Sequence, residues 1–278
     1  MKNRTLKEQD ITDFQAYLVR EEKGEATVEK YIRATREFLV FAGETPVTKE
    51  LAIAWKELLV KNCAPRTVNG KLAGLNRLLQ FLGWEDYKVK NLKIQQQAYS
   101  PEEKELTMEE YLRLLEAASG QPQLRLILET IAGTGIRVSE LRYFTVEAVR
   151  IGEIRIDNKG KNRVILLPDK LKRKLREWAK AEGIASGAIF LSRSGSPLSR
   201  SLIWLRMKNL CETAGVAASK VFPHNLRKLF ARRFYEVKED IAKLADVLGH
   251  SNINTTRIYI MTTGVEHRRI LNQLGLVV

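Results

Sequence analysis

The sequence predicts an α+β protein that is mainly helical, contains one small β-hairpin and divides into two domains. Apolar residues recur at helical spacing through roughly the first 92 positions, a polar stretch without periodicity follows, and helical patterns then resume with two strand-like runs among them. With 278 residues and a mass of 31.8 kDa, the chain is long enough for two separate cores. We therefore expect a helical domain at residues 1–93, a linker at 94–105 and a mixed domain at 106–278.

Four helices joined by short loops are expected in the first domain. Apolar side chains share one face of each run, as Phe14, Tyr17 and Leu18 do in the first. Gly83 follows the fourth run, where a glycine commonly ends a helix. The four runs cover residues 6–22, 27–43, 51–61 and 64–83.

The second domain is expected to open with a helix whose first turn is capped by Thr107 and Glu110, because their spacing forms a capping box. Two strand-like runs flank a tight turn at Lys159, which is typical of a β-hairpin. The strands are expected at residues 152–158 and 163–168, and further helices at 123–135, 171–183, 199–215, 223–237, 240–250 and 252–260.

The charge balance indicates a polyanionic partner. Lys and Arg number 47 against 33 Asp and Glu, which gives a formal net charge of +14 and a pI near 9.8. Nucleic acid and an anionic membrane both fit such a surplus. However, no stretch approaches the roughly 20 apolar residues of a membrane-spanning helix, and the polar N-terminus lacks the apolar core of a signal peptide. We therefore expect a cytoplasmic protein without membrane contact.

Cofactor and metal motifs are not found in the sequence. Cys63 and Cys211 stand far apart and fit neither a disulfide framework nor a CxxC metal site, so both are expected to be reduced, buried thiols. There is no GxxxxGK[ST] loop and no carboxylate cluster like that of a two-metal nuclease. We therefore expect no nucleotide, metal or other cofactor.

Basic residues that could contact phosphates occur in both domains. The fourth helical run carries Arg66, Lys71 and Arg77 without an acidic residue, so it is the N-terminal segment expected nearest a DNA backbone. A solvated basic face is the alternative interpretation. The candidates in the second domain are Lys161, Lys220 and Arg232.

Two short motifs carry arginines that could bind a phosphate. In TGIRVSEL, Arg137 follows a glycine-bounded break and Glu140 lies one turn later, so the pair fits either a phosphate-binding arginine or a plain surface ion pair. In FPHNLRKLF, His224 and Arg227 lie one helical turn apart and could converge on one phosphate. An ordinary helix of a basic protein is the alternative for this second motif.

A third motif ends in a tyrosine. In LGHSNINTTRIYI, His250 follows Gly249 directly and Tyr259 lies nine residues later. Considered singly, Tyr259 fits an amphipathic tyrosine with a buried ring and a solvated hydroxyl.

Taken together, the motifs of this chain resemble those of the tyrosine recombinase (phage integrase) family. They occur in the order T-G-x-R-x-S-E-L, a hairpin lysine, H-x-L-R, L-G-H and a tyrosine nine residues on. The resemblance covers most of the chain, including the helical first domain. It is nearest to integrases of bacterial conjugative transposons and other mobile elements, with Xer-type recombinases as more distant relatives. It implies an all-helical core-binding domain and a mixed α/β catalytic domain that form a C-shaped clamp on duplex DNA.

The resemblance also implies a role for each motif residue. Tyr259 becomes the nucleophile, and Arg137 and Arg227 neutralise the charge that builds on the scissile phosphate. His224 assists removal of the tyrosine proton, and His250 donates a hydrogen bond to the phosphate.

Two further roles concern the hairpin and the arginine-bearing turn. Lys159 protonates the departing 5′-hydroxyl, but the turn is one residue shorter than the common G-K-G-x-K-x-R form, so Lys161 competes for this role. Glu140 holds the segment of Arg137 in place. Lys228 stands where many relatives have a histidine, and no catalytic role depends on it.

The function implied is site-specific recombination of a mobile element, comprising integration and excision through a 3′-phosphotyrosine intermediate and a Holliday junction without metal or ATP. The implied partners are double-stranded DNA with a core site, a homotetramer on two duplexes, and accessory bending or directionality proteins. The apolar C-terminal tail is expected to dock on a neighbouring protomer, with packing on its own domain as the alternative. The competing functions are a type IB topoisomerase-like activity and a catalytically silent DNA-binding regulator. The apolar residues of the tail are Ile270, Leu271, Leu274 and Leu276.

Overall fold

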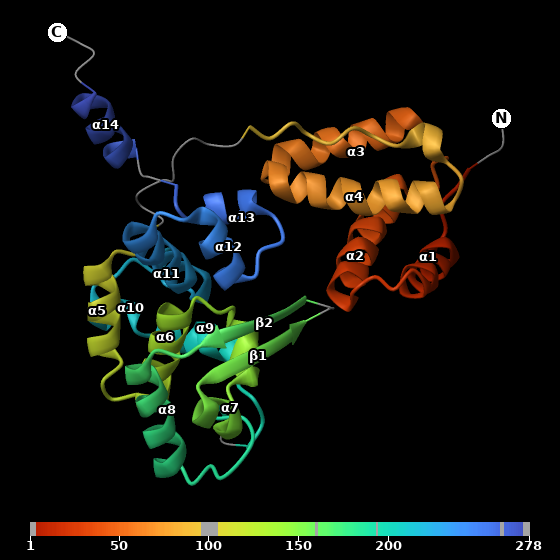
Figure 1. Ribbon diagram of the computed structural model, residues 1–278. Coiled ribbons are helices and arrows are strands. Elements are labelled where there is room, and N and C mark those ends of the chain that lie inside the picture. Colours follow the sequence, from red (N-terminus) through yellow and green to blue (C-terminus); the bar gives the residue numbers. More distant parts are fainter. Residues whose placement is uncertain (1–3, 96–104, 159–160, 193, 262–263, 275–278) are drawn as a thin grey trace. The chain divides into compact units, whose positions relative to one another are not determined.

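A computed structural model describes residues 4–95, 105–158, 161–192, 194–261 and 264–274. These residues form a mostly helical chain whose strands make one two-stranded sheet (Figure 1). The mainly helical α+β fold predicted from the sequence is therefore confirmed. The chain divides into two units, residues 1–96 and 97–278, and most of the linker expected at 94–105 lies outside the described residues.

The first unit consists of helices α1 to α4 and a short 3₁₀ turn, η1. Thr48 caps α3 by accepting a hydrogen bond from the Leu51 amide, and Pro65 occupies the first turn of α4, where its missing N–H costs nothing. Their apolar faces meet in one core, in which the rings of Phe38 and Trp55 pack edge to face at 5.2 Å. The bounds are α1 (Glu8–Arg20), α2 (Glu25–Ala42), α3 (Lys49–Asn62), α4 (Pro65–Phe81) and η1 (Glu85–Tyr87).

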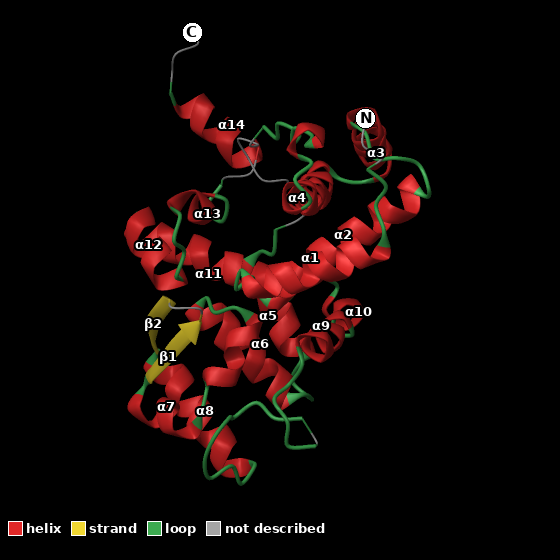
Figure 2. Cartoon of the chain, turned by 90° about the vertical axis from the view of Figure 1, so that its right-hand side faces the viewer, coloured by secondary structure: helices red, strands yellow, loops and turns green. Residues whose placement is uncertain are grey.

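The second unit builds its main core from helices packed against each other and against one face of the hairpin (Figure 2). As predicted, Thr107 and Glu110 form the capping box that opens its first helix. The first elements are α5 (Met108–Ala117), α6 (Pro122–Thr134), η3 (Val138–Tyr143), α7 (Val146–Ile151), β1 (Glu153–Asn158), β2 (Lys161–Leu166) and α8 (Asp169–Ala181). The later ones are α9 (Arg200–Lys208), α10 (Cys211–Ala214), α11 (Pro223–Lys238), α12 (Ile241–Leu248), α13 (Ile253–Arg257) and α14 (Gly264–Gln273).

Several elements differ from the sequence expectation. The segment after Arg137 is a 3₁₀ helix rather than the start of an α-helix, and α7 occupies a stretch for which no helix was expected, because six residues are too few to show helical periodicity. The single helix expected at 199–215 is divided into α9 and α10. There the Leu210 amide bonds the Met207 carbonyl, three residues back, and this interrupts the α-helical pattern.

The β-hairpin has one buried and one exposed face. β1 and β2 pair antiparallel with Ile154 opposite Ile165 and Ile156 opposite Arg163. The three isoleucines point into the core, whereas Val164 and Leu166 lie exposed on the opposite face. By this alternation Arg163 belongs to the buried face.

Helix packing brings the three sequence motifs together. α11 packs against α6, so the His224–Arg227 turn lies beside the glycine break that precedes Arg137. α12 packs on both α11 and α13, and a small apolar cluster of Ala231, Leu244, Leu248 and Tyr259 fills the space between them.

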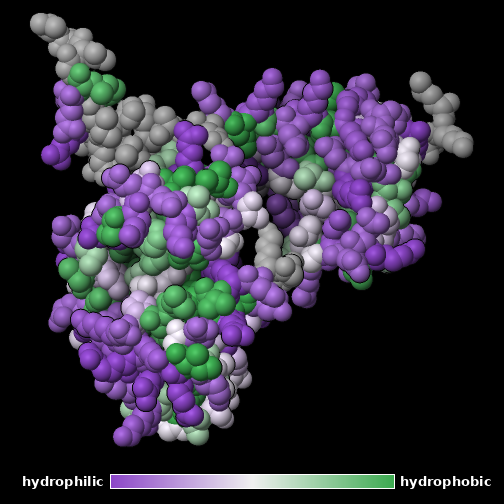
Figure 3. All heavy atoms as spheres, in the orientation of Figure 1, coloured by the Kyte–Doolittle hydropathy of each residue, from purple (hydrophilic) through white to green (hydrophobic). Residues whose placement is uncertain are grey.

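The surface agrees with the charged composition. Hydrophilic residues cover most of the face drawn in Figure 3, with smaller apolar areas between them. Among the described residues, no helix is long and apolar enough to cross a membrane. Both cysteines are free, but only Cys211 is buried; Cys63 is partly exposed, contrary to the expectation of two buried thiols.

Candidate active site

The turn that carries Arg137 depends on a glycine. α6 ends at Gly135, which adopts a left-handed conformation at φ +64°, and a Cβ there would lie 2.3 Å from a ring carbon of Phe230. The chain therefore passes close under α11 before it reaches Arg137. The Arg137 side chain is 44% exposed, so part of its guanidinium faces solvent.

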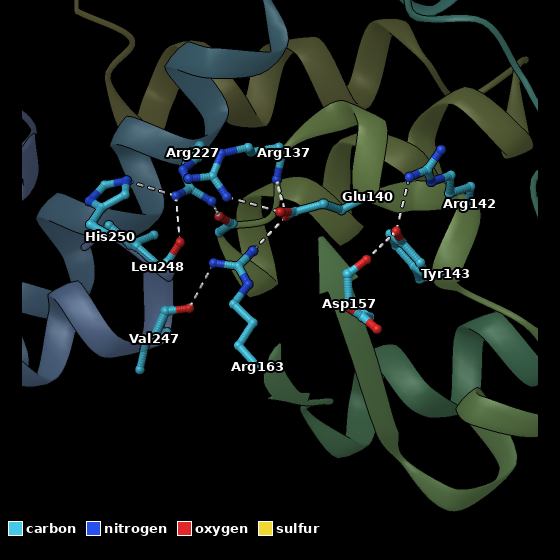
Figure 4. A network of polar contacts seen from close by, with 11 residues as sticks. Arg137, Glu140, Arg142, Tyr143, Asp157, Arg163, Arg227, Val247, Leu248 and His250 are labelled. Atoms are coloured by element: carbon cyan, nitrogen blue, oxygen red, sulfur yellow. Dashed lines mark hydrogen bonds and ion pairs between the residues drawn. The ribbon is translucent and has the colours of Figure 1, made fainter. Parts of the chain in front are cut away.

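Glu140 anchors this turn from inside. Its carboxylate is only 2% exposed and accepts hydrogen bonds from the Arg137 backbone amide at 2.7 Å and from the Arg137 Nη1 at 3.0 Å (Figure 4). A third donor, Arg163 Nη2, lies 2.5 Å from the same carboxylate. The surface ion pair considered from the sequence is thus a network with a buried carboxylate at its centre. A charge-assisted network of this kind fixes the direction of the Arg137 side chain.

Arg227 is the most enclosed charge of the site. It is 1% exposed, and its two terminal nitrogens donate to the carbonyls of Gly135 at 2.5 Å and Leu248 at 2.7 Å. Burial, with the like charge of Arg137 as the next cause, lowers the pKa of Arg227 to about 10. Arg227 is therefore still protonated at neutral pH and adds a fixed positive charge beside Arg137.

His250 lies against Arg227 as a neutral ring. Its Nε2 is 2.9 Å from Arg227 Nη2, which can only donate, so Nε2 is the acceptor and Nδ1 carries the proton. Nδ1 lies 2.9 Å from the hydroxyl of Thr256, a fully buried residue that fixes this tautomer. Burial first and then the Arg227 charge lower the pKa of His250 to about 4.

The Tyr259 ring lies between two histidines. Its centroid is 5.2 Å from the rings of both His224 and His250, and the guanidinium carbon of Arg227 lies 6.0 Å from it. Burial, followed by the charge of Arg227, lowers the pKa of His224, so this imidazole is neutral at pH 7 and can accept a proton.

The structure therefore gathers most of the residues singled out from the sequence at one place. Two positions cannot be compared, because Lys159 lies outside the described residues and the side chain of Lys161 is not among those described. The residues brought together are Arg137, Glu140, His224, Arg227, His250 and Tyr259.

Two hollows flank this group. One, of about 650 Å³, lies between the hairpin and the His250 turn and is lined by Arg163 and Ser251. The other, of about 820 Å³, lies beside His224 and is lined by Arg200 and Trp204 of α9. Arg137 borders both hollows, so a chain of phosphates could pass across it from one hollow to the other.

Several residues of the site were missed in the sequence. Arg163 and Thr256 reach the motif residues from separate segments. Thr256 has no local pattern that marks it, and Arg163, which ends the segment compared with the G-K-G-x-K-x-R form, was given no role there. Arg200 and Trp204 sit in the first turns of α9 on its exposed side. An exposed tryptophan in a basic helix was the signal that could have drawn attention to this face.

The basic residues proposed for DNA contact have different surroundings. Arg66 is exposed near the start of α4. The other described candidates form ion pairs within their own unit: Lys71 with Glu37, Arg77 with Glu21, Lys220 with Glu110 and Arg232 with Glu105.

The donor set at the site consists of guanidinium groups, imidazoles, a phenol and one carboxylate. Among the described residues, no group of three or more His, Cys, Asp and Glu side chains is placed to hold a metal ion.

In the C-terminal tail, Leu271 and Leu274 of the described part are exposed. The Ile270 side chain and Leu276 are not described.

Comparisons with known proteins agree with this arrangement. The sequence profile of the phage integrase family matches residues 104–264. The chain is 28% identical to tyrosine recombinase XerA of Pyrococcus furiosus, over 99% of this chain and 97% of that protein. It is 31% identical to tyrosine recombinase XerA of Thermococcus kodakarensis, over 93% of this chain and 92% of that protein. A solved lambda integrase tetramer bound to a Holliday junction has the same fold, with a TM-score of 0.74 at 18% identity, over 91% of this chain and 76% of that one.

Proposed function

The chain belongs to the phage integrase family of tyrosine recombinases, and on this premise we propose that it cuts and rejoins DNA at a specific site with Tyr259 as the nucleophile. The observation that carries this proposal is the position of the Tyr259 ring, between His224 and His250 and beside Arg227. A phenol with an ordinary pKa near 10 needs a proton acceptor and a polarised phosphorus in order to react at neutral pH. His224 is the proton acceptor beside this ring, and Arg227 is the charge beside it that can polarise a bound phosphate.

In the first step the Tyr259 oxygen forms a bond to phosphorus while the bond from phosphorus to the 5′-oxygen breaks. The phenol proton passes to His224, whose neutral state at pH 7 suits a general base. The product is a 3′-phosphotyrosine, which keeps the energy of the phosphodiester bond. A 5′-hydroxyl from another strand can therefore reverse the step and seal a new junction without ATP.

Arg137 and Arg227 stabilise the transition state. Negative charge grows on the non-bridging oxygens as phosphorus becomes five-coordinate, and fixed guanidinium groups are worth most at that moment. Arg137 is the exposed member of the pair, and Glu140 directs it. His250 donates from Nε2 to the phosphate only after DNA displaces the hydrogen bond from Arg227 and the ring proton moves from Nδ1 to Nε2.

The departing 5′-oxygen needs a proton, and we assign its delivery to Lys159, with Lys161 as the competitor. The position of β1 supports this assignment, because β1 packs on η3, which begins directly after Arg137, and Lys159 follows the last residue of β1 in the sequence. A lysine at a hairpin tip can follow the leaving group as the phosphate geometry changes.

The partners and setting follow from the proposed reaction. Exchange between two duplexes needs two protomers on each, so we propose a homotetramer on two core sites; the lambda integrase tetramer on a Holliday junction supports this. The helical first unit serves as the core-binding domain, and the second unit is catalytic. The protein works in the cytoplasm, where the DNA of a bacterial or archaeal cell lies. Accessory bending or directionality proteins complete the set of expected partners.

The test is covalent trapping on nicked duplexes cut from the DNA that flanks the gene, in the presence of EDTA. The wild-type chain is expected to give a denaturation-resistant adduct, and Tyr259→Phe none. Tyr235→Phe is the matched control, because this tyrosine of α11 packs against the same apolar cluster and belongs to none of the three motifs. The mapped position of the adduct also decides whether the core site lies at the end of a mobile element.

The alternatives give different results. A type IB topoisomerase would relax plasmids that lack the mapped site as fast as plasmids that carry it. A silent regulator would bind the duplex with equal affinity as wild type and Tyr259→Phe and would form no adduct with either.

A further inference from the structure

Arg163 places a charge on the face of the hairpin that points into the protein. Its side chain is 11% exposed, and it stands opposite the buried Ile156 on the same face as Ile165. Its Nε is buried and makes no hydrogen bond within the described part of the chain. An aliphatic residue would fit this face at a lower desolvation cost, so the charge needs a reason outside hairpin stability.

One end of the Arg163 fork reaches the turn that carries Arg137. Nη2 lies 2.5 Å from the buried Glu140 carboxylate, which itself holds both the backbone and the side chain of Arg137. Glu140 thus shares its two oxygens between two arginines. Arg163 fixes the carboxylate from below, and the carboxylate fixes the exposed guanidinium above it (Figure 4).

The other end of the fork reaches the turn that carries His250. Nη1 donates to the Val247 carbonyl at 3.3 Å, in the last turn of α12. The Arg163 side chain also lies over Gly249, where a Cβ would come within 2.7 Å of the Arg163 Cδ. Arg163 therefore touches the residue directly before His250.

We propose that Arg163 is a positioning residue for strand cleavage, which holds the Arg137 turn and the His250 turn at a fixed separation around the scissile phosphate. The inference rests on the proposed function. A planar fork with two donors facing two acceptors suits this role, whereas a lysine offers a single point charge. Arg163 does not touch the phosphate in this role; it acts through Glu140 and through the end of α12.

The test uses single-turnover cleavage of the mapped nicked duplex, with the maximal rate and the half-saturating protein concentration measured separately. We expect the half-saturating protein concentration of Arg163→Met to stay within about twofold of the wild-type value. The maximal rate should fall by about 10- to 100-fold, the range typical for loss of a residue that orients a catalytic group. Arg163→Lys is expected to recover only part of the rate. Arg155→Met is the matched control, since Arg155 lies in the same hairpin with its side chain 84% exposed.

A second substrate separates positioning from general damage to the fold. A methylphosphonate at the scissile position removes one non-bridging charge, so the reaction depends less on Arg137. The loss in Arg163→Met should shrink several-fold on this substrate, as it should in Arg137→Ala. Equal losses on both substrates, or a wild-type rate on the phosphate, would overturn the inference. If the wild type forms no adduct at all, the proposed function fails first, and the inference fails with it.

Discussion

Gly249→Ala tests what the contact between Arg163 and the His250 turn contributes to stability and to cleavage. Gly249 has φ +63°, a conformation that costs an alanine about 1–2 kcal/mol. The new methyl group would also lie 2.7 Å from Arg163 Cδ and 2.8 Å from its Nη1, so the arginine must move away from Glu140 or from the Val247 carbonyl. Loss of such a buried, charge-assisted bond adds roughly 1–3 kcal/mol. We therefore expect a total destabilisation of about 2–5 kcal/mol.

Gly215→Ala supplies the matched control. Gly215 ends α10 in the same unit with φ +58°, and a Cβ there meets nothing within 4 Å. The Gly215→Ala variant should therefore lose only the free energy that the left-handed backbone conformation costs an alanine, about 1–2 kcal/mol. By differential scanning calorimetry, at roughly 2–4 °C per kcal/mol, the transition of the second unit should fall by about 4–20 °C for Gly249→Ala and about 2–8 °C for Gly215→Ala. Adduct formation should decrease only in the first variant. Equal melting shifts and equal adduct yields in the two variants would refute the reasoning.

Three further results are expected. As pH falls from about 6.5 to about 4, the free energy of unfolding should drop by roughly 1–2 kcal/mol. The reason is that His250 takes up a proton in the unfolded chain, whereas the half-buried ring of the folded protein, with its pKa near 4, does not. Urea unfolding at several pH values measures this change, and His250→Asn should make the free energy of unfolding depend less on pH. Lys220→Met should leave the salt dependence of DNA binding unchanged but lower the stability of the protein, because Glu110 loses its partner. Arg66→Ala, in contrast, should reduce the slope of log binding constant against log salt concentration by about 1. Thr256→Val should cost about 1–3 kcal/mol in chemical unfolding, since the Nδ1 proton of His250 is left without its acceptor, and a wild-type midpoint would contradict this tautomer.

Local spacing made much of this site predictable. His224 and Arg227 were expected on one face of a helix because three residues nearly complete a turn, and α11 carries them in that way. Likewise, Glu140 was expected beside Arg137, and the hydrogen bonds between them form within four residues of chain. The longer helices of both units, such as α2 and α6, were predicted for the same reason, since their apolar residues repeat at helical spacing over a dozen or more positions.

Contacts between distant segments could not be predicted in this way. Arg163 meets Glu140 across 23 residues and Val247 across 84, and nothing in its strand distinguishes it from a solvent-facing arginine until the register places it on the inner face. The degree of burial of Arg227 was equally hidden, because it depends on two carbonyls, of Gly135 and Leu248, at the ends of two other helices. Short elements such as α7 escape prediction because they have too few residues for periodicity.

The charges at the site explain why these long-range contacts matter. Arg137 and Arg163 share one carboxylate, Glu140, and Arg227 has only carbonyls and a neutral imidazole as its described hydrogen-bond partners, so the group carries a net positive charge before any DNA arrives. Desolvation and the repulsion between like charges lower two pKa values. The pKa of Arg227 falls to about 10, by burial first and then by the charge of Arg137, and the lowered pKa of His250 keeps that ring neutral. In the proposed reaction, a phosphate that enters between Arg137 and Arg227 would supply the missing negative charge, and the transition state, with more charge on the same oxygens, would supply more. Buried carbonyls and Glu140 must hold the arginines apart until then, because free side chains would turn to solvent and leave the phosphorus without its fixed donors.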